Sequence, residues 1–173
     1  MDNVFLGIGS NIGDRVYFLA QAVRKLRGIP STRIVKVSSV YETEPVGVKN
    51  QGDFLNAVLW LQTSMGVVDF HSCIKSIEKE IGRLDRKRWG PREIDIDILL
   101  FGDVVVIDGT LAIPHAEMVN RKFVLQPLVE IAPEAVHPGV HKTIKVLLAE
   151  CNDTNTVKHS AQLTHSLFTT MQE

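Results

Sequence analysis

The sequence predicts an α+β protein, a ferredoxin-like sandwich in which a mainly antiparallel sheet packs against helices. The first observation is the order of the apolar patterns, which runs strand, helix, strand, strand, helix, strand and is typical of split βαβ units. The second is the length of 173 residues, which corresponds to about one domain. The third is the composition, because 45% hydrophobic and 23% charged residues are typical of a globular protein.

The first elements are a strand and a helix. Residues 4–8 are a short apolar run that predicts a buried strand, closed by the turn Gly9-Ser10-Asn11. Apolar residues then recur at three- and four-residue spacing over 16–26, which predicts a helix. Asp14 is its candidate N-cap, and Gly28 is expected to end it.

Two further strands and a second helix follow. Residues 34–41 are rich in β-branched side chains, and 54–61 are an apolar run, so both predict strands. The connector 42–53 is long for a simple loop and is a candidate for a functional role. An apolar stripe over 70–81 predicts the second helix, which should stop at Gly82.

The remaining patterns complete the domain. Residues 94–101 predict a strong strand, with 104–107 as its expected hairpin partner. A last helix is expected near 123–131. We predict a domain over 1–150, followed over 151–173 by a C-terminal polar tail or one short helix, because most residues there are polar.

Two aspartates stand out in the strand predicted at 94–101. Side chains alternate between the faces of a strand, so Asp95 and Asp97 point the same way, with Cα atoms ~6.6 Å apart. The same alternation places Leu99 and Phe101 on that face. Unpartnered carboxylates at the rim of a buried region are costly, and aspartate oxygens are suitable ligands for Mg²⁺. The pair therefore predicts a magnesium site, with a solvated strand face as the simpler alternative.

A run of cations precedes the aspartates. Residues 83–92 contain five cations and one anion, a local charge of +4 in a chain of formal net charge -1. Guanidinium groups bind phosphate oxygens well, although a basic run of this kind is ordinarily just an exposed turn. Its position beside the acidic pair favours phosphoryl transfer, in which positioning and charge neutralisation supply most of the catalysis.

Other patterns and functions remain weaker alternatives. Residues 7–13 contain three glycines after a strand, but their spacing departs from a dinucleotide-binding fingerprint, so a strand-to-helix turn is favoured. His137 and His141 have helical metal-ligand spacing, but Pro138 and Gly139 between them predict a loop. A hydrolase with two catalytic carboxylates and a non-catalytic single-strand nucleic-acid module are the competing functions.

Residues 88–99 read Arg-Trp-Gly-Pro-Arg-Glu-Ile-Asp-Ile-Asp-Ile-Leu. This segment closely resembles the signature of the 6-hydroxymethyl-7,8-dihydropterin pyrophosphokinase family of folate biosynthesis. Supporting matches in the same order cover about residues 3–148 and are Gly9-Ser10-Asn11, Ser38 to Thr43, Phe54 to Ala57, Ile113 to His115, and Asn120-Arg121. The resemblance implies an enzyme that transfers diphosphate from ATP to the hydroxymethyl oxygen of the pterin and releases AMP.

The resemblance also implies roles for individual residues. Asp95 and Asp97 would hold two Mg²⁺ ions that bridge the ATP phosphates, and Arg83 and Arg92 would complete the catalytic set by neutralising the diphosphate. The residues implied to bind the pterin are Thr43, Pro45, Val46, Phe54, Asn56, Trp89 and Phe123. Those implied to bind ATP are Glu78, Trp89, Arg92, Ile98, His115 and Arg121. The chain departs from frequent family choices at Phe54, Thr110, Ala112 and Ala116, where we expect altered substrate affinity.

Composition sets expectations about partners and location. Lys and Arg number 19 against 20 Asp and Glu, which excludes a globally basic nucleic-acid binder. No apolar run approaches the ~18 residues of a membrane-spanning helix, and the first residues do not read as a secretory leader. We therefore expect a cytoplasmic monomer that binds ATP and a pterin, with no membrane or nucleic-acid partner.

Overall fold

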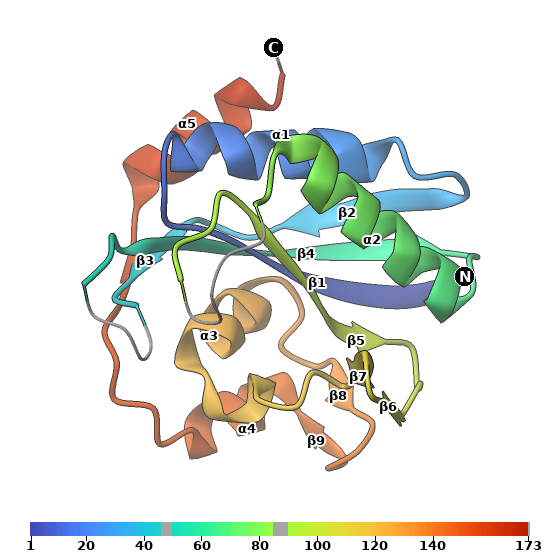
Figure 1. Ribbon diagram of the computed structural model, residues 1–173. Coiled ribbons are helices and arrows are strands. Elements are labelled where there is room, and N and C mark those ends of the chain that lie inside the picture. The colour runs from blue at the N-terminus through green and yellow to red at the C-terminus, as the bar shows by residue number, and fades with distance from the viewer. Residues whose placement is uncertain (46–49, 85–89, 173) are drawn as a thin grey trace.

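The computed structural model describes residues 1–45, 50–84 and 90–172, which form a six-stranded antiparallel sheet with helices on both faces (Figure 1). In chain order the elements are β1 (Asp2–Ser10), α1 (Arg15–Arg27), β2 (Thr32–Val37), β3 (Tyr41–Thr43), β4 (Phe54–Thr63), α2 (Val67–Ile81), β5 (Asp95–Phe101), β6 (Val106–Asp108), β7 (Leu111–Ile113), the 3-10 helix η1 (Met118–Asn120), α3 (Lys122–Ile131), β8 (Val136–His137), β9 (Lys142–Thr143), α4 (Ile144–Glu150), β10 (Val157–His159) and α5 (Ala161–Thr170). The sheet order is β10-β3-β4-β1-β5, with β2 also paired to β4. This is the strand order of a ferredoxin-like sandwich, so the predicted fold class is confirmed.

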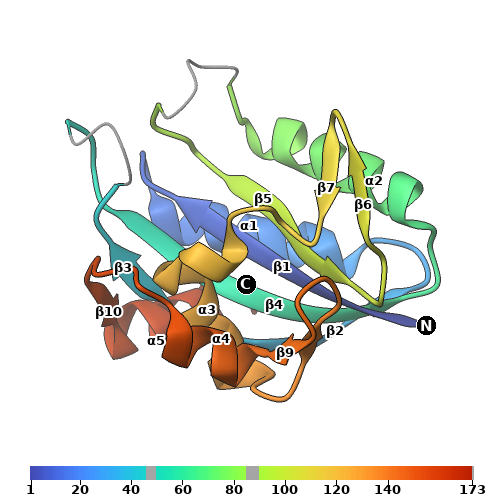
Figure 2. The ribbon, with the colours of Figure 1, turned by 90° about the horizontal axis from the view of Figure 1, so that it is seen from below.

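The two faces of the sheet carry separate apolar cores. On the face covered by α1, α2 and α5, side chains such as Ile8, Leu19 and Phe70 are buried. On the opposite face, which α3 and α4 cover, Val58 of β4 and Leu125 of α3 belong to the second core (Figures 1 and 2). Central strands serve both cores because successive side chains point to opposite faces.

Helix boundaries follow local chemistry. The Asp14 carboxylate accepts a hydrogen bond from the Tyr17 N–H at 3.0 Å and so caps α1, which ends at Gly28. α2 ends at Gly82, whose φ of 104° lies in the left-handed region that favours glycine. The predicted cap and both predicted stops are confirmed. No helix within the described ranges combines the length and hydropathy needed to cross a lipid bilayer.

The strand predicted over 34–41 is two strands in the structure. β2 and β3 both pair with β4, and Ser38 lies between them. The Ser38 hydroxyl accepts a hydrogen bond from the Val58 N–H at 2.9 Å, and the Ser38 N–H donates to the Val58 carbonyl at 2.9 Å. Because a side-chain oxygen takes the place of a backbone acceptor, the ladder is interrupted there.

The hairpin expected between 94–101 and 104–107 is wrong. The chain turns at Gly102, whose φ is 48°, and the Val104 N–H donates to the Phe101 carbonyl at 2.9 Å. This tight turn directs the chain away from β5, and β6 pairs with β7 instead. β5 is therefore an edge strand of the main sheet.

The face alternation predicted along β5 is interrupted by a bulge. The register between β1 and β5 shifts between Phe5 and Leu6, where Leu99 is the extra residue on β5. Leu99 and Leu100 consequently both join the core under α3, and Phe101 joins the opposite core. Leu99 shares the aspartate face as expected, but the expectation that Phe101 does so is wrong.

The C-terminal residues contribute more than a polar tail or one short helix. β10 extends the sheet beyond β3, and α5 packs against α1. Leu167 is fully buried and Met171 is 6% exposed, and both belong to the core that α1 covers. Residues 157–171 therefore pack against β3 and α1.

Candidate active site

The sheet is hollow on the face that α3 covers because β1 carries two glycines there. Gly9 pairs with Asn56 on β4 and with Asp95 on β5, and Gly7 pairs with Asp97. Direct partners in a sheet share a face, so these polar side chains surround a strip of bare backbone. A Cβ atom at Gly9 would lie 3.0 Å from Asn56 Oδ1, which shows how little room a side chain would have.

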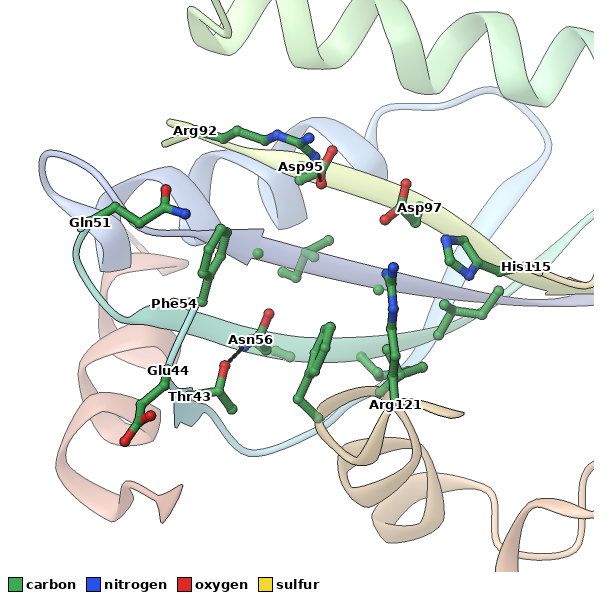
Figure 3. Close-up of a pocket in the computed structure, with 18 of the residues that line it drawn as sticks. Thr43, Glu44, Gln51, Phe54, Asn56, Arg92, Asp95, Asp97, His115 and Arg121 are labelled. Atoms are coloured by element: carbon green, nitrogen blue, oxygen red, sulfur yellow. Dashed lines mark hydrogen bonds and ion pairs between the residues drawn. The ribbon is translucent and has the colours of Figure 1, made fainter. Parts of the chain in front are cut away.

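This hollow is a cavity bounded by β1, β3, β4, β5 and the start of α3. Figure 3 shows Asp95 and Asp97 on one strand, and Arg121 extending from the start of α3 toward His115. The residues predicted for the site that line this cavity are Thr43, Phe54, Asn56, Arg92, Asp95, Asp97, His115, Arg121 and Phe123. The tertiary structure thus brings residues predicted to bind the pterin and residues predicted to bind metal and ATP into one cavity.

Two arginines hold Asp95. Its Oδ1 accepts a hydrogen bond from Arg83 Nη1 at 2.7 Å, and its Oδ2 is bonded by Arg92 Nη1. The Arg92 N–H donates to Asn11 Oδ1 at 2.8 Å, and the Arg92 carbonyl accepts from the Asn11 N–H at 3.1 Å. The arginine-bearing segment is therefore fixed to the end of β1.

Asp97 has a different environment. Within the described ranges, no hydrogen bond or ion pair reaches its carboxylate. Burial and the neighbouring charge of Asp95 raise the pKa of Asp97 from 3.8 to about 6. A cation bound nearby would stabilise the charged form of this carboxylate.

The acidic pair fits the donor set of Mg²⁺. This ion commonly takes one or two carboxylates and completes its octahedron with water and substrate phosphates. Asp95 and Asp97 lie on one face of β5 and both line the cavity. In the described part of the chain, no group of three or more His, Cys, Asp or Glu residues could hold a metal. The described residues therefore offer two ligands and not a complete cage.

One end of the cavity suits a flat, polar molecule. Asn56 Nδ2 donates to Thr43 Oγ1 at 2.7 Å, and both side chains are buried. Phe54 and Phe123 line the same cavity. Aromatic faces with a few placed polar groups are the usual means of binding a planar heterocycle.

A second cavity adjoins the first, and Asp97, His115 and Arg121 line both. The His115 N–H donates to the Leu99 carbonyl at 2.9 Å, which holds the residue beside β5. Burial and the Arg121 guanidinium lower the pKa of His115, so its imidazole is neutral at neutral pH. Other residues that line the second cavity include Ile98, Thr110, Ala112, Ala116, Asn152, Asp153 and Asn155.

Glu78 lies behind the acidic strand and lines neither cavity. Its carboxylate is 3% exposed and is bonded by Arg83 Nη1, by Lys75 Nζ at 2.9 Å and by the Ile96 N–H at 2.7 Å. Arg83 also bonds Asp95 and likewise lines neither cavity. Glu78 therefore connects α2 to the acidic strand, and the contact with ATP that the resemblance implies for it stays a prediction.

Some predicted site residues do not line the described cavities, and two glycines that do line the first cavity were not predicted as site residues. Val46 and Trp89 lie outside the described residues, and Pro45 lines neither cavity. Gly7 lies in the strand predicted over 4–8 and Gly9 in the predicted turn, but both belong to β1, where they form the bare floor of the site. Their spacing was the available signal, because glycines two apart in a strand clear one face of it.

The sequence is similar to those of characterised enzymes. It is 44% identical to a 2-amino-4-hydroxy-6-hydroxymethyldihydropteridine pyrophosphokinase of Aquifex aeolicus over 91% of this chain and 95% of that protein. It is 43% identical to the enzyme of the same name from Bacillus subtilis, over 78% and 81% of the two chains. A crystal structure of Plasmodium falciparum HPPK-DHPS has the same fold, with a TM-score of 0.68 and 17% identity over 87% of this chain and 43% of that one.

Paired carboxylates with Arg92 and Arg121 at one cavity are typical of phosphoryl-group transferases. The model of the 7,8-dihydro-6-hydroxymethylpterin-pyrophosphokinase family matches residues 5–133, and the chain belongs to this family. The enzyme transfers diphosphate from ATP to 6-hydroxymethyl-7,8-dihydropterin, a step of folate biosynthesis. The resemblance noted in the sequence is thereby confirmed.

Proposed function

We propose that the pterin occupies the first cavity, that ATP occupies the second, and that the reacting groups meet where the two adjoin. The observation that carries this proposal is the position of the acidic pair. Asp95 lines the first cavity, and Asp97 lines both, together with His115 and Arg121. Negative and positive side chains therefore converge at the junction, where a diphosphate would pass from one substrate to the other.

Asp95 and Asp97 would hold Mg²⁺ at this junction, as two ions. When bound, the metal supplies positive charge to the phosphates of ATP. The raised pKa of Asp97 supports this assignment, because a carboxylate placed beside another carboxylate is stabilised in its charged form by a cation.

Arg83 and Arg92 are proposed to neutralise the diphosphate as it moves. Each bonds Asp95 through Nη1, and a guanidinium carries five N–H donors, so each has capacity for phosphate oxygens as well. The backbone bonds between Arg92 and Asn11 keep this charge in place before the substrate arrives. His115, Arg121 and Ile98 are proposed to contact ATP in the second cavity.

The pterin is proposed to stack on Phe123, with Phe54 beside it. The bonded pair Asn56 and Thr43 would then read the polar edge of the ring. Trp89, Val46 and Pro45 remain proposed pterin contacts from the resemblance alone.

The enzyme is further proposed to act as a monomer in the cytoplasm on small molecules only. The nearly balanced charge gives no general attraction to nucleic acid or to an acidic membrane surface.

A product assay tests the proposal. Incubation with ATP, Mg²⁺ and the hydroxymethyl pterin should yield AMP and no ADP, and an excess of chelator should stop the reaction. Asn56→Ala should raise KM for the pterin roughly tenfold, since it removes a buried polar contact, and should leave KM for ATP within about twofold. Turnover that survives full chelation would favour a metal-independent reaction at the two carboxylates.

Gly9→Ala is expected to weaken pterin binding in a protein that remains folded. The added Cβ would lie 3.0 Å from Asn56 Oδ1, so the Asn56 amide must shift, and this disturbs its hydrogen bond to Thr43. Gly66→Ala is the matched control, because a Cβ there meets nothing within 4 Å. Fluorescence titration with the pterin should give roughly tenfold weaker binding for Gly9→Ala than for Gly66→Ala. Equal affinities would contradict the proposed pterin location.

A further inference from the structure

The C-terminal segment 157–171 lies beyond the stretch matched by the family model and beside the strand that carries Thr43 (Figure 2). The paired residues of β10 and β3 are Val157 and Thr43, Lys158 and Glu42, and His159 and Tyr41. β3 is only three residues long, and without β10 it would present a row of unpaired backbone groups at the sheet edge. β10 therefore fixes β3 from the side opposite to β4.

The same segment holds the residue that precedes β3. The Val40 N–H donates to the Thr164 hydroxyl at 2.8 Å, and the Val40 carbonyl accepts from the Ser160 N–H at 3.0 Å. The Thr164 hydroxyl also donates to the Ser160 carbonyl at 2.7 Å. Val40 is fully buried, so its backbone groups depend on protein partners of this kind.

α5 is itself anchored to the body of the protein. Leu167 and Met171 are buried in the core that α1 covers. Arg24 of α1 donates through Nη2 to the Thr170 carbonyl at 2.9 Å. The segment therefore connects a rigid helical layer to the short strand at the pterin end of the site.

We propose that residues 157–171 are a positioning element for the pterin end of the active site, acting through β3 on the hydrogen bond between Thr43 and Asn56. This inference rests on the proposed function, in which that pair reads the polar edge of the pterin. None of the residues 157–171 lines either cavity, so their effect is exerted through β3. Thr43 connects the segment to the site directly. It pairs with Val157 of β10, and its hydroxyl accepts a hydrogen bond from the Asn56 amide at 2.7 Å.

Three single variants of the full chain test this role. Thr164→Val keeps the side-chain shape but removes the acceptor for the Val40 N–H. Thr164→Ser retains the hydroxyl and should restore wild-type behaviour. Thr169→Val is the matched control, because among the described residues the Thr169 hydroxyl bonds only the His165 carbonyl within α5, at 3.0 Å.

Steady-state kinetics with each substrate varied in turn gives the readout. Thr164→Val should raise KM for the pterin roughly fivefold, the size expected for one lost buried hydrogen bond, with KM for ATP unchanged. Thr164→Ser and Thr169→Val should match the wild type. If Thr164→Val lowers the melting temperature but leaves KM for the pterin unchanged, the segment is structural only and the inference fails. If Asn56→Ala also leaves that KM unchanged, the proposed pterin site itself has failed.

Discussion

Asp97→Asn should abolish diphosphate transfer and at the same time make the metal-free protein more stable. The variant removes one of the two proposed Mg²⁺ ligands, and we expect kcat to fall by roughly a thousandfold or more. The carboxylate is also a source of instability without metal, because burial and the charge of Asp95 raise its pKa to about 6. Loss of activity with a gain of stability is the pattern expected of a residue kept for function and not for folding.

The pH dependence of the gain follows from linkage. A carboxyl group whose folded pKa is raised costs stability when it is ionised, so the cost is absent below pH ~4 and complete above pH ~6. Thermal unfolding in chelator should therefore show Asp97→Asn more stable than the wild type at pH 8, by on the order of 3 kcal/mol, with no difference near pH 4. Asp103→Asn, at an exposed turn residue after β5, is the matched control. A variant with near-normal turnover would refute the metal-binding role of Asp97.

Glu78→Ala should destabilise the protein strongly and slow the reaction. Its carboxylate is 3% exposed and satisfies the Ile96 N–H, Lys75 and Arg83 together. Removal of one partner of a buried ion pair leaves the other charge uncompensated, which costs about 3 kcal/mol or more and should lower the melting temperature by about 10 °C. Arg83 would also lose the carboxylate partner that holds its guanidinium beside Asp95, so kcat should fall as well.

Two further variants separate the roles of Glu78. Glu78→Gln retains an acceptor for the Ile96 N–H and should recover much of the stability but not the full kcat, because the charge that orients Arg83 is lost. Glu80→Ala, on the same helix, removes an exposed ion pair with Lys25 and should cost less than about 1 kcal/mol. If Glu78→Ala raised KM for ATP with unchanged stability, the residue would be an ATP contact after all.

Much of the fold could be predicted because its signals are local. The Asp14 cap, the Gly82 stop and the strand and helix order follow from spacing and residue type within a few positions of each other. Two of the errors in the strands arise from contacts that spacing does not encode. Ser38 interrupts a strand through a hydrogen bond to Val58, twenty positions away, and β6 finds its partner in β7 because a turn diverts it from β5.

The candidate site also has a part that local patterns predict and a part that they do not. Alternation along one strand was sufficient to place Asp95 and Asp97 on a common face, and the motif around them was sufficient to suggest the family. The cavity itself is assembled from several strands and the start of a helix. Its bare floor at Gly7 and Gly9 has meaning only once β4 and β5 lie on either side of β1.

The amino-acid sequence by itself determined the ferredoxin-like class, the acidic pair and the family. Only the tertiary structure decided that Glu78 lies behind the acidic strand and that residues 157–171 hold the edge of the sheet at β3. The physical reason is range: periodicity, capping and strand alternation act between near neighbours along the chain. Strand partners and the occupants of a shared cavity are chosen by packing and hydrogen bonding between distant segments, which a one-dimensional pattern does not record.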